Sequence, residues 1–257
     1  MSAHLFLVEF ADRRLVARFP SPYLATFVPD PVTYEAATLR ALARQEVDAP
    51  RVVATDGEMV VLTYCDGAAT ANPAGFDDYY GDLARRLAEI HRTPTDGFEH
   101  LVPMKPNYTP RPEPWRTDLS EADLVSALQA LPAPDLSQRV LRHGDFWPGN
   151  VLWQDGHVSA VIDWENALLG PAVADLAISQ LDMMWIGGRA AMQAFTDAYL
   201  AARDADLREL KYWQIRATLR PMPNFDEWAG PYASLDRPDI TTDTMQAGLL
   251  EFIEEIL

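Results

Sequence analysis

The residues of this chain that could do chemistry are concentrated in RHGDFWPGNVLW, residues 142–153. Asp145 and Asn150 stand five residues apart there, and Asp163 follows a second apolar segment, in VIDW. Two carboxylates and an amide oxygen are hard ligands of the kind that Mg²⁺ prefers, with phosphates and water completing its octahedron. Such a site also needs a carboxylate that is free to orient and deprotonate a hydroxyl. The pattern predicts Asn150 and Asp163 as metal ligands and Asp145 as that base.

A β-hairpin is expected to bring these side chains together. The segments NVLWQ and HVSAVIDW flank Asp155-Gly156, a dipeptide suited to a tight two-residue turn. This turn sets the expected cross-strand pairs as Gln154–His157, Leu152–Ser159 and Asn150–Val161. Asp163 then lies opposite Pro148, beside the loop that carries Asp145. Asp, Asn, Gly and Pro are also ordinary turn formers, so the prediction depends on their joint spacing.

Composition limits the classes of function. A chain of 257 residues can form one large domain or two lobes with a cleft between them. The net charge of −17 argues against a nucleic-acid binder and is compatible with a cationic substrate or with a solvated acidic surface. No apolar run approaches the roughly eighteen residues of a membrane span. The N-terminus lacks signal-peptide features and Cys65 is the single cysteine, so we expect a cytoplasmic protein without a membrane partner.

The order of the expected elements indicates an α+β protein. Two strands are expected over 4–19, a helix over 33–45, and two more strands over 49–67 around Asp56-Gly57. From residue 68 the pattern is mainly helical, with a loop over 93–118. The expected helices are 76–93, 120–131 (with Ser120 as its cap), 172–185, 189–203, 206–220 and 241–256. We therefore expect an N-terminal lobe over 1–66 and a helical lobe over 67–257, with a hinge at 64–67.

The stretch HGDFWPGN followed by VIDW resembles the catalytic and metal-binding motifs of the aminoglycoside phosphotransferase and choline kinase-like family. In that family the motif is H-G-D-x-x-x-x-N, and a later strand ends in I-D-W or I-D-F; both are matched here without a gap. EAATLRALA, LTYCDG and LARRLAEIH resemble, in order, the first helix of the family, its hinge and its next helix. The resemblance implies a bilobal protein-kinase-like fold, with Mg²⁺, with ATP or GTP as co-substrate, and with a small-molecule hydroxyl as acceptor.

The resemblance also implies a role for each matching residue of the larger lobe. Asp145 corresponds to the catalytic base, and His143 to the histidine that braces the catalytic loop. Asn150 and Asp163 correspond to the Mg²⁺ ligands. Asp175, in ADLA, is expected to tie the loop after the metal site to the start of a helix.

In the smaller lobe, Arg18 corresponds to the cation that reaches the nucleotide phosphates, and Glu35 to its helix carboxylate. Lysine occurs only at positions 105 and 211, so an arginine must supply this cation. Glu165 follows the metal aspartate and could either support the metal site or lie on the surface. At the hinge, the backbone carbonyl of Thr63 and the amide of Cys65 are expected to face the nucleotide base, with Leu62 closing the pocket behind it.

The family usually has a further strand and a glycine-bearing loop before the strand with its cation. Here the first glycine is Gly57, so the nucleotide lid is absent, shortened to ADRR, or lost through a wrong start codon. Two hypotheses follow: a small-molecule kinase, or a pseudokinase or binding module of the same fold without turnover. A two-metal phosphoesterase needs more ligands than five scattered histidines offer, and a nucleophilic hydrolase needs a G-x-S-x-G motif that the sequence lacks.

The acceptor and the oligomeric state stay open. Residues towards the C-terminus could contact a cationic acceptor through carboxylates or aromatic rings, although helix surface and helix core explain the same residues. The acidic set is Asp226, Glu227, Asp243 and Glu251, and the aromatic set is Trp213, Phe225 and Trp228.

Overall fold

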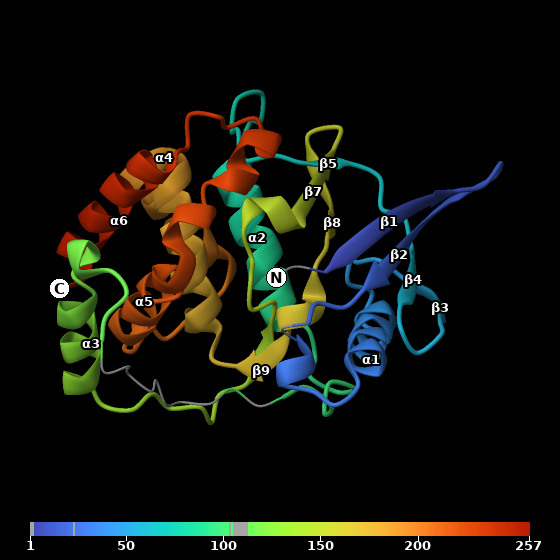
Figure 1. The fold of residues 1–257 in the computed structure, drawn as a ribbon, viewed down its shortest axis with the longest axis horizontal. Helices are drawn as coiled ribbons and strands as arrows, with labels where there is room; N and C mark the ends of the chain where they lie inside the picture. The colour runs from blue at the N-terminus through green and yellow to red at the C-terminus, as the bar shows by residue number, and fades with distance from the viewer. Residues whose placement is uncertain (1–2, 23, 103, 105–112) are drawn as a thin grey trace.

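A four-stranded antiparallel sheet forms the N-terminal part of the protein, in a computed structural model that describes residues 3–22, 24–102, 104 and 113–257. The strand order is β1-β2-β4-β3. The bounds are β1 (His4–Glu9), β2 (Arg14–Phe19), β3 (Val52–Thr55) and β4 (Val60–Thr63). Figure 1 shows this sheet and helix α1 (Pro31–Arg44) on one side of the molecule, and the larger helical part on the other. The predicted α+β organisation is confirmed.

Helix α1 packs one apolar face against the core. It begins earlier than predicted, because the carboxylate of Asp30 accepts a hydrogen bond from the Thr33 amide (3.0 Å) and Pro31 occupies the first turn. Ala36, Leu39 and Leu42 form this face and are 0–2% exposed. This burial fixes α1 beside the sheet and determines where its polar residues lie.

The larger part is built from helices around two small sheets. The helices are α2 (Tyr79–Arg92), α3 (Glu121–Ala130), α4 (Ala172–Ala202), α5 (Leu210–Thr218) and α6 (Thr242–Ile256). One sheet joins β5 (Ala68–Ala69), β7 (Val151–Gln154) and β8 (His157–Val161); the other joins β6 (Val140–Arg142) and β9 (Leu168–Gly170). Among the described residues, no helix is both long and apolar enough to cross a membrane.

Helix α4 joins two helices that the sequence predicted separately, over 172–185 and 189–203. The backbone leaves helical geometry at Gly187 and Gly188, where φ of Gly188 is +68°. The two predicted helices therefore meet at a glycine kink with no loop between them.

Two details of the helical part differ from the prediction. Ser120 adopts a left-handed conformation (φ 53°) and makes no capping hydrogen bond. The carboxylate of Glu121 instead accepts from the amides of Trp115 (2.6 Å) and Arg116 (2.8 Å). The predicted helix 206–220 is shortened to α5. The loop predicted over 93–118 falls partly outside the described residues.

Candidate functional site

The β7–β8 hairpin follows the predicted catalytic motif and has a register one residue away from the predicted one. Gln154 lies opposite His157 as predicted, but Leu152 faces Ala160 and Val151 faces Val161. The pairs Leu152–Ser159 and Asn150–Val161 were wrong, and Asp163 does not lie opposite Pro148. The reason is a β-bulge at Ser159, which has no cross-strand partner. Its hydroxyl donates to the carbonyls of Asp66 (2.8 Å) and Leu152 (3.2 Å).

A cavity of about 280 Å³ lies between the N-terminal sheet and this hairpin. Its walls contain every residue that the sequence suggested for the nucleotide and the metal: Arg18, Glu35, Leu62, Thr63, Cys65, Asn150 and Asp163. Residues more than a hundred positions apart thus line one space. We call it the nucleotide cavity after this prediction; nucleotide binding and the individual roles of these residues stay predictions.

Arg18 lines the nucleotide cavity and contacts three carboxylates. It is 4% exposed, and its Nε lies 2.5 Å from Oε1 of Glu35. Its Nη2 lies 2.6 Å from Asp163 and 3.0 Å from Glu165. Burial raises the pKa of Glu35 to about 7, although Arg18 acts to lower it. The sequence left open whether Glu165 supports the metal site or lies on the surface. Its contact with Arg18 places it in this cluster.

Asn150 and Asp163 offer oxygen atoms to the same cavity. Asn150 donates its Nδ2 to the Asp145 carbonyl (2.9 Å), which leaves its amide oxygen as the donor for a cation. Asp163 has a left-handed backbone (φ 62°), a strained conformation typical of functional sites. In the described part of the chain, no three His, Cys, Asp or Glu side chains could hold a metal by themselves. The donor set fits Mg²⁺ bound by two protein oxygens together with phosphates.

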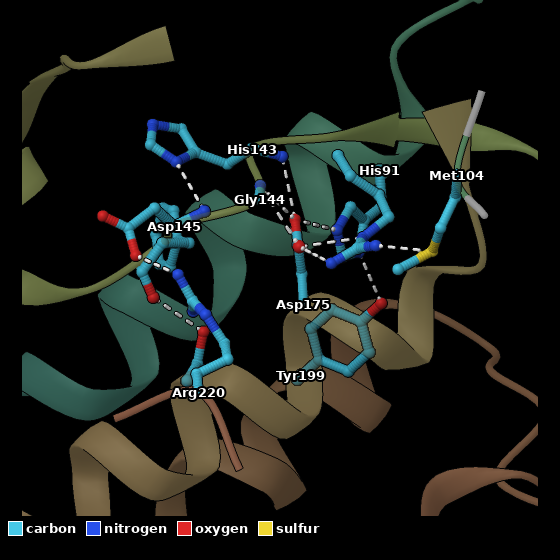
Figure 2. A network of polar contacts seen from close by, with 11 residues as sticks. His91, Met104, His143, Gly144, Asp145, Asp175, Tyr199 and Arg220 are labelled. Atoms are coloured by element: carbon cyan, nitrogen blue, oxygen red, sulfur yellow. Dashed lines mark hydrogen bonds and ion pairs between the residues drawn. The ribbon is translucent and has the colours of Figure 1, made fainter. Parts of the chain in front are cut away.

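Asp145 is paired with an arginine that sequence reasoning missed. Its Oδ1 lies 2.9 Å from Nη2 of Arg220, which follows α5 (Figure 2). No local pattern links Arg220 to a loop 75 residues earlier, so only the fold could reveal the pair.

A second carboxylate, Asp182, is buried near Asp145. It is 7% exposed and accepts a hydrogen bond from the Tyr232 hydroxyl (3.4 Å). Burial, followed by the charge of Asp145, raises the pKa of Asp182 well above its usual range.

His143 is fully buried and makes only internal contacts. Its Nε2 lies 2.9 Å from the Ile162 carbonyl, and its Nδ1 accepts from the Asp145 amide (3.3 Å). Its ring lies 4.7 Å from that of Trp164. These contacts join the loop of residues 143–150 to the strand that leads to Asp163. The bracing role of His143 stays a prediction.

Asp175 ties the catalytic loop, rather than the loop after the metal site, to the first turn of α4. Its carboxylate accepts from the amides of His143 (2.8 Å) and Gly144 (3.2 Å) and from Arg142 Nε (2.8 Å). Figure 2 shows Asp175 at the centre of this network, beside His91. Burial alone would raise the pKa of Asp175, but the Arg142 guanidinium and His91 outweigh it and hold that pKa far below its usual range.

Gly144→Ala is expected to destabilise the protein far more than Gly156→Ala. Both glycines have positive φ (+81° and +82°), which costs an alanine about 1–2 kcal/mol. A Cβ at Gly144 would also lie 2.2 Å from the carbonyl oxygen of Asn166, whereas one at Gly156 meets nothing within 4 Å. Urea unfolding of both variants measures the difference. Equal losses would mean that the loop yields freely at Asn166.

Comparison with known proteins gives a consistent grouping. A family model described as phosphotransferase enzyme family (APH) matches residues 1–213. Acyl-CoA dehydrogenase family member 10 of Mus musculus is 26% identical over 262 residues, which cover 87% of this chain and 23% of that protein. The chain thus spans about a quarter of the length of the curated relative it matches.

Two solved structures have a similar fold. Macrolide 2'-phosphotransferase MphH from Brachybacterium faecium superposes with a TM-score of 0.63 at 18% identity, covering 97% of this chain and 89% of that one. Spectinomycin phosphotransferase APH(9)-Ia, solved with ADP and spectinomycin, gives 0.65 at 14% identity, covering 100% and 91%. At these identities the superpositions show the fold alone.

Proposed function

Because the chain belongs to the phosphotransferase enzyme family, we propose that it is a small-molecule kinase that transfers the γ-phosphoryl group of ATP or GTP to a hydroxyl group. One observation carries the proposal. The nucleotide cavity contains Arg18, Asn150 and Asp163 together, and Asn150 also contacts Asp145. A phosphate grip, two oxygen ligands and a carboxylate base therefore adjoin one another, as phosphoryl transfer requires.

In this proposal each side chain has a separate task. Arg18 binds phosphate oxygens through its guanidinium, and Glu35 fixes its direction. Leu62, Thr63 and Cys65 line the end of the cavity that would take the base. Asn150 and Asp163 would hold Mg²⁺, which would supply neutralisation of charge on the phosphates.

Asp145 would accept the proton of the acceptor hydroxyl as that oxygen attacks the phosphorus. Its carboxylate is held from two sides, by Arg220 at 2.9 Å and by Asn150 Nδ2 at 3.4 Å. Both contacts fix the direction of the carboxylate, so the base is oriented before an acceptor arrives.

The proposal also covers the organisation and setting of the protein. Residues 1–66 would bind the nucleotide and residues 67–257 would supply catalysis and acceptor binding. The single cysteine supports a cytoplasmic setting, and the net charge of −17 supports a protein without a nucleic-acid partner.

A pseudokinase is the second possibility, and the β1–β2 turn favours it. Residues 10–13 of this turn contain no glycine, and the Phe10 amide is already bonded to the Arg13 carbonyl (2.8 Å). Such a turn offers fewer free amides to phosphates than a glycine-rich loop does.

A thermal-shift titration with ATP and with GTP, each with and without Mg²⁺, tests nucleotide binding. A nucleotide at a hundred times its Kd is expected to stabilise the wild type by about 2.7 kcal/mol, because it binds only the native state. Asp163→Asn is expected to lose the Mg²⁺-dependent part of this gain. A melting temperature unmoved by millimolar nucleotide would contradict the kinase proposal. Nucleotide consumption across a panel of hydroxyl compounds, with Asp145→Ala as the blank, then separates a kinase from a pseudokinase.

A further inference from the structure

A second cavity, of about 160 Å³, lies beside α4 and α5. Three guanidinium groups and one indole line it, among smaller apolar side chains: Arg142, Arg216, Arg220 and Trp213. Within the described part of the chain, no acidic side chain lines this cavity. We call it the arginine cavity. The polar groups of these four side chains are all hydrogen-bond donors.

Two of these groups have donors that the fold leaves without a good acceptor. Trp213 is 2% exposed, and its indole Nε1 has no hydrogen-bond partner among the described residues. An indole N–H can only donate, so burial without an acceptor is unfavourable. Arg142 uses Nε and Nη2 for Asp175, while its Nη1 lies 3.1 Å from the sulfur of Met104, a weak acceptor. A ligand whose oxygen acceptors reached these donors would satisfy both groups.

The arginine cavity adjoins the proposed catalytic base. Arg220 lines the cavity and also contacts Asp145 through Nη2 at 2.9 Å. A single guanidinium therefore links the space to the carboxylate. A molecule bound to Arg220 in the cavity would therefore sit next to a residue that contacts Asp145.

We propose that the arginine cavity binds the oxyanion, a carboxylate or a phosphate, of the acceptor whose hydroxyl is presented to Asp145. This inference rests on the proposed function and names the substrate class: a small hydroxyl compound that carries a negative charge. Single N–H donors from several guanidiniums can converge on a planar or tetrahedral oxyanion, and the indole would add one more donor. A volume of 160 Å³ corresponds to about five water molecules, which is room for an oxyanion on a short carbon chain.

Two of the carboxylates that the sequence suggested for a cationic acceptor already have arginine partners. Asp226 pairs with Arg116 (3.1 Å), and Glu251 pairs with Arg189 (3.3 Å). Phe225 is 1% exposed and packs in the core.

Ligand binding without nucleotide tests the inference. The probes are 3-hydroxybutyrate and glycerol 3-phosphate, with butane-1,3-diol, glycerol and choline as uncharged and cationic counterparts. Wild-type protein is expected to show a thermal shift with at least one anionic probe and none with the counterparts. The two anionic probes distinguish a carboxylate site from a phosphate site. Equal shifts with the neutral compounds or choline, or none with either anion, would overturn the inference.

Trp213→Phe tests the cavity itself, because it removes one N–H and keeps an aromatic ring. It is expected to weaken binding of the anionic probe about tenfold or more, the loss of one hydrogen bond to a charged group. Trp153→Phe is the matched control: Trp153 is also buried, with an indole Nε1 that lacks a partner in the described structure, but lies outside the cavity. The affinity of Trp153→Phe for the anionic probe is expected to match that of the wild type. Arg220→Gln, at a partly exposed position, is the second variant and should weaken binding further.

These measurements separate a failure of the inference from a failure of the proposed function. Nucleotide consumption with neutral or cationic acceptors, together with no binding of the anionic probes, would overturn the inference and leave the kinase standing. Binding of an anionic probe that Trp213→Phe weakens supports the inference even in a protein that consumes no nucleotide. An unchanged affinity in both Trp213→Phe and Arg220→Gln would overturn it.

Discussion

Replacing Asp145 with asparagine is expected to lower acceptor-dependent nucleotide consumption by about 10²–10⁴-fold, the usual contribution of a general base. The change removes the ability to accept a proton and the negative charge that pairs with Arg220, and it keeps the size of the side chain. The backbone carbonyl of residue 145 still accepts from Asn150 Nδ2, so the loop keeps that contact. The Asp145 side chain is 30% exposed and its Arg220 partner 34%, so loss of the ion pair should cost less than about 1 kcal/mol. Turnover should therefore fall in a protein that remains folded.

Asp155→Asn provides the matched control for this experiment. Asp155 lies in the turn of the β7–β8 hairpin, is exposed, and has a left-handed backbone (φ 52°) that asparagine tolerates well. The same chemical change, ten residues from Asp145, should leave consumption and stability unchanged. Steady-state rates of nucleotide consumption and melting temperatures of both variants test these two predictions. Wild-type turnover by Asp145→Asn would remove this residue from the catalytic role.

The sequence could predict the local elements of the fold because their signals are local. The apolar spacing of Ala36, Leu39 and Leu42 requires one buried helix face, and the structure buries it. Asp155-Gly156 placed the hairpin turn correctly. The register beyond it could not be predicted, because the bulge at Ser159 depends on a hydrogen bond to the Asp66 carbonyl, 93 residues away.

The same distinction applies to the site. Asp145, Asn150 and Asp163 were found because their spacing within two short motifs carries chemical meaning. Arg220 carries no such spacing, and the contact with Asp145 depends on how α5 packs in the helical part. At Ser120 a local signal gave a wrong prediction. Its residue type favours a helix cap, but its backbone is left-handed and its side chain makes no capping hydrogen bond.

Asp175→Asn is expected to destabilise the protein by about 3–5 kcal/mol at pH 7, because it leaves the charge of Arg142 buried without a counter-ion. Arg142 is 1% exposed, so water cannot replace the lost carboxylate. The control is Asp48→Asn, which removes the partner of Arg86 in a surface pair (3.1 Å) and should cost less than about 1 kcal/mol. Urea unfolding gives both values.

The pH dependence identifies the charge as the cause. The folded protein holds the pKa of Asp175 below its unfolded value of about 3.9, so its contribution to the free energy of unfolding is complete above that value. The contribution is lost as pH falls further, because the unfolded chain then binds the proton first. The difference between wild type and Asp175→Asn should accordingly stay constant from pH 7 to about 5 and shrink below about 4. A difference that is unchanged at pH 3 would mean that the hydrogen bonds to His143 and Gly144, rather than the ion pair with Arg142, hold the catalytic loop in place.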